Sequence, residues 1–473
     1  MISSVTGVTG DLRACRGDIL VSFLQKARSH LTEGGSSENL AQRSLSLKHN
    51  FAWTFAGNVV YAGCQWGMLV VLAKLGTPDM VGQFGLGLAI CAPVFMFTNL
   101  QLRAAQATDS KREYCFSDYL GLRLIATTLA LLVITGIVVV ARFRVQTGLV
   151  ILAVGVAKGF ESISDVFYGL CQQRERMDRI AKSMMIKGPL SLAALGLAVY
   201  ETGSVLWGVV GLALAWAAIL ASYDVRSGTF VLSLAGEALP DTAYQGQVPS
   251  VSLRPRWHRK ALAKLAWLAL PLGFVMMLIS LNTNIPRYFI QHYLRERELG
   301  IFVALAYVMV GGSLVVNALG QSATPRLAKH YEEGQLSAFR TLLLKLAGIG
   351  AVLGGAGIVV AAVAGRPILA ALYGAEYAAH AHVFLWLVAA GAIGYVASFL
   401  GYGMTAARYF RAQVPLFALV SGASAAACLW LVPADGLRGA AMALILAAIV
   451  QAGGSLGVIT YAMWRRCADR CEE

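Results

Sequence analysis

The chain has 473 residues, of which 57% are hydrophobic and 14% are charged, and its mean hydropathy is +0.64. This composition excludes an ordinary soluble domain and indicates a membrane protein. The formal net charge of +14 does not call for a nucleic-acid partner, because an excess of Lys and Arg on the inner side of a membrane produces the same charge.

A helix that crosses a bilayer needs roughly 20 mostly apolar residues. The chain contains about twelve such stretches, and they are too long and too little alternating for the strands of a membrane barrel. We therefore expect an all-α integral membrane protein of about twelve transmembrane helices. The expected spans cover residues 50–73, 81–102, 120–140, 148–170, 183–200, 205–222, 262–285, 299–322, 341–363, 381–404, 413–432 and 439–463.

The residues before the first span are expected to form a partly disordered cytoplasmic tail. A secretory signal peptide is not expected, because the apolar run from Ile19 to Leu24 is too short and no small-residue cleavage site follows it. The stretch from Gly34 to Ser37 is typical of a flexible linker. Alternatively, apolar residues between Ile19 and Leu31 form one face of a short helix on the inner leaflet.

A polar stretch that contains Pro240, Pro249 and Pro255 separates the expected spans into two groups of six. Six is an even number, so both groups enter the membrane in the same direction. The expected divisions are a cytoplasmic tail at 1–49, an N-terminal six-helix lobe at 50–222, a cytoplasmic linker at 223–261, a C-terminal six-helix lobe at 262–464 and a cytoplasmic tail at 465–473.

The two groups look like copies of one unit. Three residues of the second span recur at one constant offset in the eighth: Gly82, Phe84 and Asn99 as Gly300, Phe302 and Asn317. Parallel copies predict two lobes related by a pseudo-two-fold axis along the membrane normal, with a binding site between them near mid-depth.

The first expected span carries one face of uncharged hydrogen-bonding groups. Asn58, Tyr61 and Gln65 fall within about 80° of one another at helical periodicity. Such a face suits sugar hydroxyls or water. The alternative is hydrogen bonding to a neighbouring helix.

The fourth expected span carries charge at membrane depth. Lys158, Glu161 and Asp165 share a face of about 80° with Tyr168 and Gln172. Ionisable residues inside a span are costly unless they face a cavity or each other, so this face is a candidate functional site. The alternative is an internal salt bridge between Lys158 and Glu161 that only holds helices together.

Further candidates lie on the seventh span and at the inner end of the second. Asn284 and Arg287 share a face, and Pro286 is expected to kink or end the helix just before the arginine. The alternative for Arg287 is that its long side chain only snorkels to the outer interface. The alternative for Arg103 is that it only helps to set the orientation of the chain in the membrane.

Other chemistries find little support in the residues. The eight cysteines have no spacing suited to a metal or a disulfide framework, and His380 and His382 alone are typical of a polar loop. We find no phosphate-cradling loop and no set of nucleophile, base and orienting group. We therefore expect no cofactor, no metal and no enzyme activity.

An ordered set of residues resembles a known family, the bacterial polysaccharide and oligosaccharide flippases of the multidrug/oligosaccharidyl-lipid/polysaccharide exporter superfamily. The resemblance covers roughly 48–464, nearly everything but the N-terminal tail. It is carried by Gly82, Gln83, Phe84, Pro93, Leu102, Arg103, Gln106 and Asp109, then by Glu161, Ser162, Asp165, Tyr168, Gly169, Gln172, Arg176 and Met177, and finally by Pro286, Arg287, Tyr288, Gly300, Phe302, Tyr307, Gln321, Pro325 and Arg326.

The resemblance implies a flippase that turns an undecaprenyl-pyrophosphate-linked oligosaccharide repeat unit across the bacterial inner membrane by alternating access, for O-antigen, capsule or exopolysaccharide synthesis. The implied partners are this lipid-linked substrate, membrane lipids and other polysaccharide assembly proteins. Two alternatives remain: a cation-coupled multidrug exporter of the same superfamily, and a membrane-embedded polymerase or glycosyltransferase. The former would have an acid-dominated cavity, and the latter a sizeable outer loop or domain.

The distribution of Lys and Arg predicts the topology. Most of them fall in the segments that are inside if the N-terminus is inside, which places both termini in the cytoplasm. A reporter fused after Glu473 or within 223–261 should therefore score cytoplasmic, and one near Ala378 should score periplasmic. A cytoplasmic signal near Ala378 would contradict the assignment of twelve spans.

Overall fold

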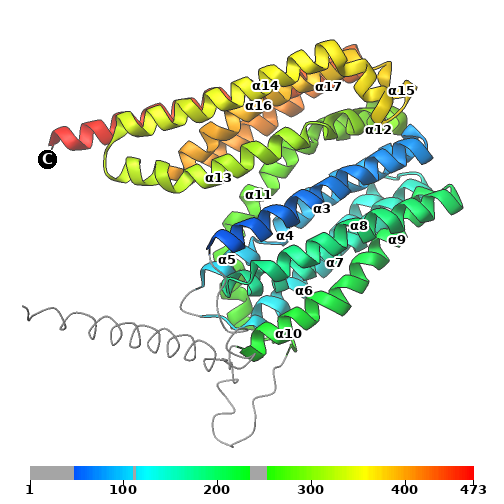
Figure 1. The fold of residues 1–473 in the computed structure, drawn as a ribbon, viewed down its shortest axis with the longest axis horizontal. Coiled ribbons are helices and arrows are strands. Elements are labelled where there is room, and N and C mark those ends of the chain that lie inside the picture. Colours follow the sequence, from blue (N-terminus) through cyan, green and yellow to red (C-terminus); the bar gives the residue numbers. More distant parts are fainter. Residues whose placement is uncertain (1–46, 110–112, 235–252, 473) are drawn as a thin grey trace, which may run out of the picture.

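The structure is a computed structural model that describes residues 47–109, 113–234 and 253–472 (Figure 1). Within these residues every regular element is a helix, which confirms the predicted all-α class. The predicted N-terminal tail lies outside the described residues except for its last three positions. The first described helix begins at Leu47, three residues before the expected span.

The helices of the N-terminal lobe follow the expected spans closely. Thr77 caps the second of them through its side chain, with Pro78 in the first turn. The lobe contains α3 (Leu47–Leu75), α4 (Pro78–Thr98), α5 (Leu102–Thr108), α6 (Phe116–Val140), α7 (Val145–Gln173), α8 (Met177–Thr202), α9 (Val205–Ile219), the π-helix η1 (Leu220–Asp224) and α10 (Val225–Leu234).

The C-terminal half contains longer helices, several of which include proline. α11 continues through Pro286, so of the two expected effects of this proline, a kink or a helix end, the helix end is excluded. The half contains α11 (Arg259–Tyr293), α12 (Arg295–Tyr307), α13 (Val310–Glu332), α14 (Leu336–Leu372), α15 (Ala375–Ala378), α16 (Ala381–Ala406) and α17 (Phe410–Glu472).

The observed helices shift two predicted boundaries. The expected linker at 223–261 overlaps α10, which extends to Leu234, and the first turn of α11. The expected C-terminal tail at 465–473 is helical through Glu472. Both differences have one cause: a helix can extend beyond the hydrocarbon layer, so the polar residues that end a span do not end the helix.

Nine helices in the described ranges are long and apolar enough to cross a membrane, and the bent pair α12 and α13 makes a tenth. α17 is counted once among these helices, although Gly436 breaks its helical backbone with a φ of 59°. α7 is not among the ten, but it is 29 residues long and contains the three charged residues singled out above. If α17 is divided at Gly436 and α7 is included, each half of the described chain has six spans.

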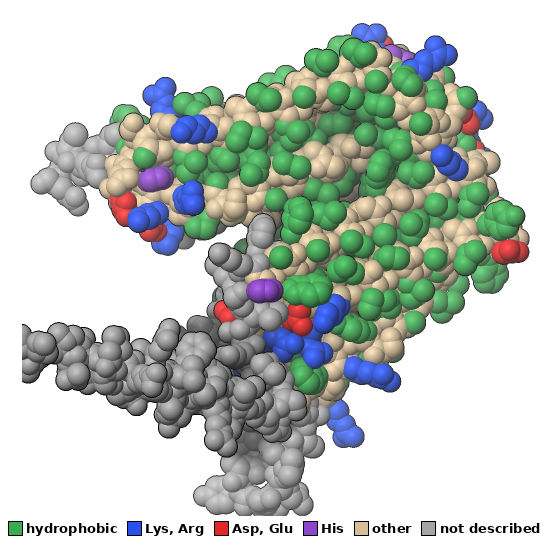
Figure 2. Space-filling view, viewed as in Figure 1, with side chains coloured by type: hydrophobic (Ala, Val, Ile, Leu, Met, Phe, Trp, Pro, Cys, Tyr) green, Lys and Arg blue, Asp and Glu red, His purple; other side chains and the backbone are tan. Residues whose placement is uncertain are grey.

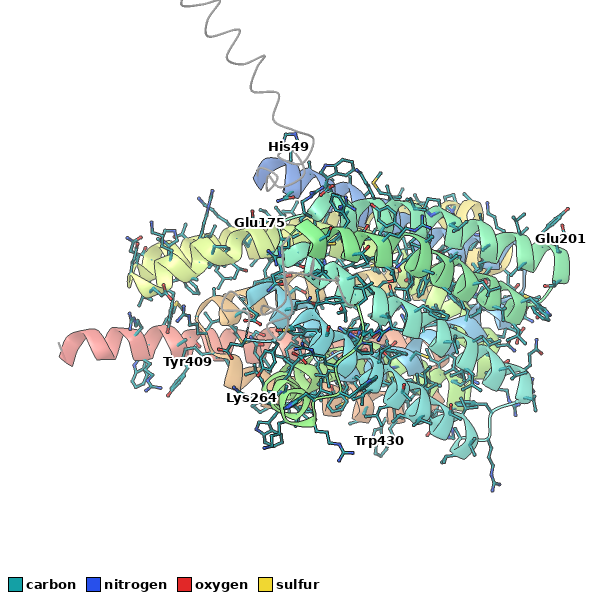
Figure 3. All side chains as sticks on the ribbon, turned by 90° about the horizontal axis from the view of Figure 1, so that it is seen from below. His49, Glu175, Glu201, Lys264, Tyr409 and Trp430 are labelled. Atoms are coloured by element: carbon teal, nitrogen blue, oxygen red, sulfur yellow. The ribbon has the colours of Figure 1, made fainter. Side chains whose placement is uncertain are left out.

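The two groups of helices form two lobes that diverge from one end, like the arms of a V (Figure 1). They meet where α12 packs against α4, and the cleft between them opens toward the end at which the C-terminus lies (Figure 2). His49, Glu175 and Tyr409 lie toward that open end, whereas Glu201 lies at the opposite end (Figure 3). Glu175 and Glu201, just before and near the end of α8, therefore lie at opposite ends of the molecule.

α11 joins the two lobes. Its first turns bury Leu262, Leu265 and Ala269 in a core cluster with residues of α6 and α7, while the helix also packs against α17 of the other lobe. α11 therefore contacts both lobes.

A close approach of two helix backbones holds the lobes together at the closed end. A Cβ atom added at Gly82 would lie 1.9 Å from the carbonyl oxygen of Glu296, and one at Gly300 would lie 1.8 Å from that of Pro78. Only glycine fits at either position without moving a helix. Gln83 Nε2 also donates to Glu296 Oε2 at 3.1 Å, and Thr147 Oγ1 donates to Glu296 Oε1 at 2.5 Å.

The glycine contact yields a prediction about the closed end. Gly82→Ala should separate α4 from α12, because the added methyl group collides with backbone at a cost of about 1–3 kcal/mol. The distance between spin labels placed at Glu201 and Ala379 should then shift to longer values.

The matched control is Gly63→Ala on α3, since a Cβ added at Gly63 meets no atom within 4 Å. It should leave the label distance unchanged. An unchanged distance in folded Gly82→Ala would show that the contact does not determine how close the lobes lie.

Candidate functional site

The polar face of α7 is linked to α3 by one side-chain hydrogen bond. Lys158 Nζ is 2.6 Å from Glu161 Oε2, one turn along the same helix, and Tyr61 of α3 donates from its hydroxyl to Glu161 Oε1 at 2.6 Å. The Lys158 ammonium also lies 5.3 Å from the ring centre of Trp216. The salt bridge weighed as the alternative is therefore present, and the structure brings Tyr61 into it.

Asp165, one turn further along α7, is held by two arginines. Arg103 NH1 is 3.5 Å from Asp165 Oδ1, and Arg123 NH2 is 3.1 Å from Asp165 Oδ2. Arg103 also donates through Nε to Gln172 at 3.0 Å. The predicted candidates Arg103 and Asp165 are thus direct partners, and Arg123 completes the group with its side chain fully buried.

A third ion pair contacts the same polar face of α7 through Tyr168. Lys187 Nζ is 3.3 Å from Asp224 Oδ2 and donates to Ser164 Oγ at 2.9 Å and to Tyr168 OH at 3.0 Å. Both charged side chains are almost completely buried. Asp224 was assigned to the linker by sequence, but it ends the π-helix η1, a deviation from α-helix that is frequent at functional sites.

Arg287 differs from these paired charges. Among the described residues no acidic group lies within ion-pair distance of it, and its hydrogen bond is to Asn284 Oδ1, 3.0 Å away on the same helix. Its Nε is buried without a partner. Tyr307 of α12 is an electrostatic neighbour of both Arg287 and Lys158, so the two predicted cations approach a common residue.

Two more of the predicted candidates, Asn58 and Gln65, lie on α3, the helix that carries Tyr61. The Asn58 amide donates to the Thr54 carbonyl one turn back, at 2.8 Å, and Asn58 is exposed. Gln65 is one turn beyond Tyr61 and half-buried. The amide of Asn58 is therefore exposed, and the amide of Gln65 lies one turn from Tyr61, which bonds to Glu161.

The charges do not balance. Four cations of the N-terminal lobe face three acids: Arg103, Arg123, Lys158 and Lys187 against Glu161, Asp165 and Asp224. One positive charge therefore remains in the network, and Arg287 adds a second from α11. A site with this excess attracts anions.

The site predicted from the sequence does not include Arg123, Lys187 or Asp224. The sequence does mark Arg123 and Lys187, because each interrupts an otherwise apolar stretch of its span. Nothing local marks Asp224, because the turn that carries it begins where the apolar run ends. Its partner Lys187 is distant in sequence, so only packing reveals the pair.

Other chemistries gain no support from the geometry. Within the ranges that the structure describes, no group of three or more His, Cys, Asp or Glu is placed to hold a metal ion. His380 and His382 lie near each other, with ring centres 6.3 Å apart and nearly parallel.

Comparison with known proteins agrees with this geometry. CapF of Staphylococcus aureus, a capsular polysaccharide biosynthesis protein, is 29% identical over 406 residues, which cover 85% of this chain and 96% of CapF. An inward-facing structure of a multidrug resistance MATE family transporter of the MOP superfamily has a TM-score of 0.63 at 13% identity, with 88% of this chain and 98% of that chain covered.

An outward-facing MATE structure has a lower TM-score of 0.55, at 14% identity, with 89% and 95% of the chains covered. At such identities the likeness shows the fold alone, which is that of MOP superfamily transporters. Residues 47–330 match the model of a family described as polysaccharide biosynthesis protein. Because that match covers more than half of its length, the chain belongs to the polysaccharide biosynthesis protein family.

Proposed function

We propose that this protein is a flippase that moves an undecaprenyl-pyrophosphate-linked oligosaccharide repeat unit from the inner to the outer leaflet of the bacterial inner membrane, for surface polysaccharide synthesis. Membership of the polysaccharide biosynthesis family and the likeness to a capsular biosynthesis protein support this proposal. The transporter fold supports movement rather than chemistry as the activity.

The observation that carries the proposal is the uncompensated charge of Arg287. A half-buried guanidinium whose Nε is buried and has no acidic partner is costly at membrane depth. A pyrophosphate would supply the missing negative charge, and the planar guanidinium can bind two phosphate oxygens at once. The cost of leaving Arg287 unpaired is thereby recovered only when an anionic substrate is present.

The surrounding groups suit the rest of such a substrate. Asn58, Gln65 and Tyr61 offer amide and hydroxyl groups to sugars, while the lipid tail can stay in the bilayer and pass along the cleft between the lobes. No covalent step is needed. The higher similarity to the inward-facing MATE structure supports an arrangement in which the open end faces the cytoplasm, where both termini are proposed to lie.

A cation-coupled drug exporter shares this fold and is the second candidate. A cationic drug needs an acid that is free to bind it, but Glu161, Asp165 and Asp224 are each paired with a cation. The charge excess therefore favours the anionic substrate. For an embedded polymerase, the described connections at the closed end, such as 141–144 and 203–204, are too short to form a catalytic domain.

The first test concerns Arg287. Arg287→Ala should reduce glycan export at least about tenfold, because a hydrogen bond to a charged group contributes about 1.5–3 kcal/mol. Protein abundance should be unchanged, since no acid loses its partner. Arg287→Lys should retain part of the activity, because lysine keeps the positive charge but cannot bind two phosphate oxygens in a bidentate manner.

Surface glycan and protein abundance are measured together in a strain that lacks its own copy. Arg340→Ala, an exposed arginine of the same lobe, is the matched control and should export normally. Export at the wild-type rate by Arg287→Ala would remove this residue from the mechanism.

The second test separates charge from structure at Lys158. Lys158→Ala should lower abundance, because it leaves the half-buried Glu161 carboxylate without its cation inside a membrane span. Lys158→Gln combined with Glu161→Gln leaves no stranded charge and should restore abundance. We expect this double variant to export poorly, since it removes a cation from the site. An abundant double variant with normal export would show that the pair only holds helices together.

A further inference from the structure

A large groove lies outside the cluster of charges just described. It has a volume of about 1120 Å³, which exceeds the range of roughly 300–1,000 Å³ typical of sites for drug-sized ligands. Its walls come from three helices: Leu86, Ile90, Pro93, Val94 and Phe97 of α4, Leu129, Val133 and Ile137 of α6, and Met277, Leu281 and Tyr288 of α11. The groove is therefore apolar along its length.

The α6 wall faces outward from the molecule. Leu129 is 50% exposed and Val133 is 42% exposed, although both line the groove. In a protein that spans a membrane, exposed leucine and valine at mid-helix lie against lipid. The α6 wall of the groove is thus open to the hydrocarbon layer.

Arginines gather at one end of the groove. Arg142, Arg144 and Arg295 line it there, all three are exposed, and none has an acidic partner within ion-pair distance among the described residues. Arg297 also lines this end but is paired with Glu376. Of the acids there, Asp79 is exposed, while Glu296 is buried and accepts two hydrogen bonds from the N-terminal lobe.

The α6 wall of the groove matches one leaflet in length. From Leu129 to Ala141 along α6 the distance is roughly 18 Å at 1.5 Å per residue. This is about half of the ~30 Å hydrocarbon thickness of a bilayer, with the arginines at the interface. A polyisoprenoid carrier, whose chain is longer than one leaflet is thick, would extend past this α6 wall.

We propose that the groove binds one anionic phospholipid of the leaflet on the closed side, with its phosphate at Arg142, Arg144 and Arg295 and its acyl chains along α6. One wall belongs to the N-terminal lobe, whereas the other is α11, which joins the lobes. The bound lipid therefore stabilises the arrangement in which the lobes meet at this end. This proposal does not depend on the transported substrate.

The test uses the full chain purified from vesicles of equal phosphatidylglycerol and phosphatidylcholine, with bound lipid counted by native mass spectrometry. The wild-type protein should retain one phosphatidylglycerol in preference to phosphatidylcholine. The combined Arg142→Gln, Arg144→Gln and Arg295→Gln variant should lose this lipid at least about tenfold, which corresponds to about 1.4 kcal/mol. Val133→Trp should also lose it, because the indole fills the groove.

Two controls match these variants. Val139→Trp places the same indole on the same helix at a position that is 70% exposed and does not line the groove. Arg326→Gln, Arg340→Gln and Lys345→Gln together remove three exposed cations from the other lobe. Both controls should keep the lipid. The three groove arginines are exposed at helix ends, so their substitution decides the result if Val133→Trp does not fold.

Several results would overturn the proposal. Equal retention of the two phospholipids would exclude a role for headgroup charge, and retention by the triple arginine variant would exclude these arginines. Loss of the lipid on addition of inorganic phosphate alone would show an anion site rather than a lipid site. Displacement by an equal amount of a polyisoprenyl phosphate would assign the groove to the lipid carrier.

Discussion

The organisation of this protein depends on the cost of placing charge in a medium of low dielectric constant. Ionised groups inside a bilayer need partners, because water is absent and the Coulomb energy of an unpaired charge is large. The N-terminal lobe meets this requirement with pairs that cross between helices: Asp165 of α7 with Arg123 of α6, and Lys187 of α8 with Asp224 of η1. These pairs also fix how the helices of the lobe lie against one another.

Arg287 is the exception, and the proposed function depends on it. It lies on α11, the helix shared between the lobes, and has no acidic partner among the described residues. Lys158 of the other lobe approaches the same tyrosine, Tyr307. An anion bound there would contact both lobes, so its binding would be coupled to their relative position. This coupling is what alternating access requires.

The two lobes also contact each other directly at the closed end. The Gly82 and Gly300 backbones touch the opposite helix directly, and buried Glu296 of α12 accepts hydrogen bonds from both α4 and α7. Glu296 also lines the groove that opens to lipid. The contact between lobes and the surface offered to the bilayer are therefore adjacent, so lipid composition can influence which arrangement of the lobes is more stable.

The sequence by itself determined the class of protein and the charged face of α7, because hydrophobic length and helical periodicity are local properties. It predicted that Lys158 and Glu161 could pair, since they are one turn apart. It could not place Tyr61 against Glu161 or Asp224 against Lys187, because those contacts depend on how helices distant in sequence pack. The lipid-facing groove likewise needs α4, α6 and α11 side by side. Only tertiary structure decided which charges are neutralised and which, like Arg287, remain available, because pairing is set by distances in space.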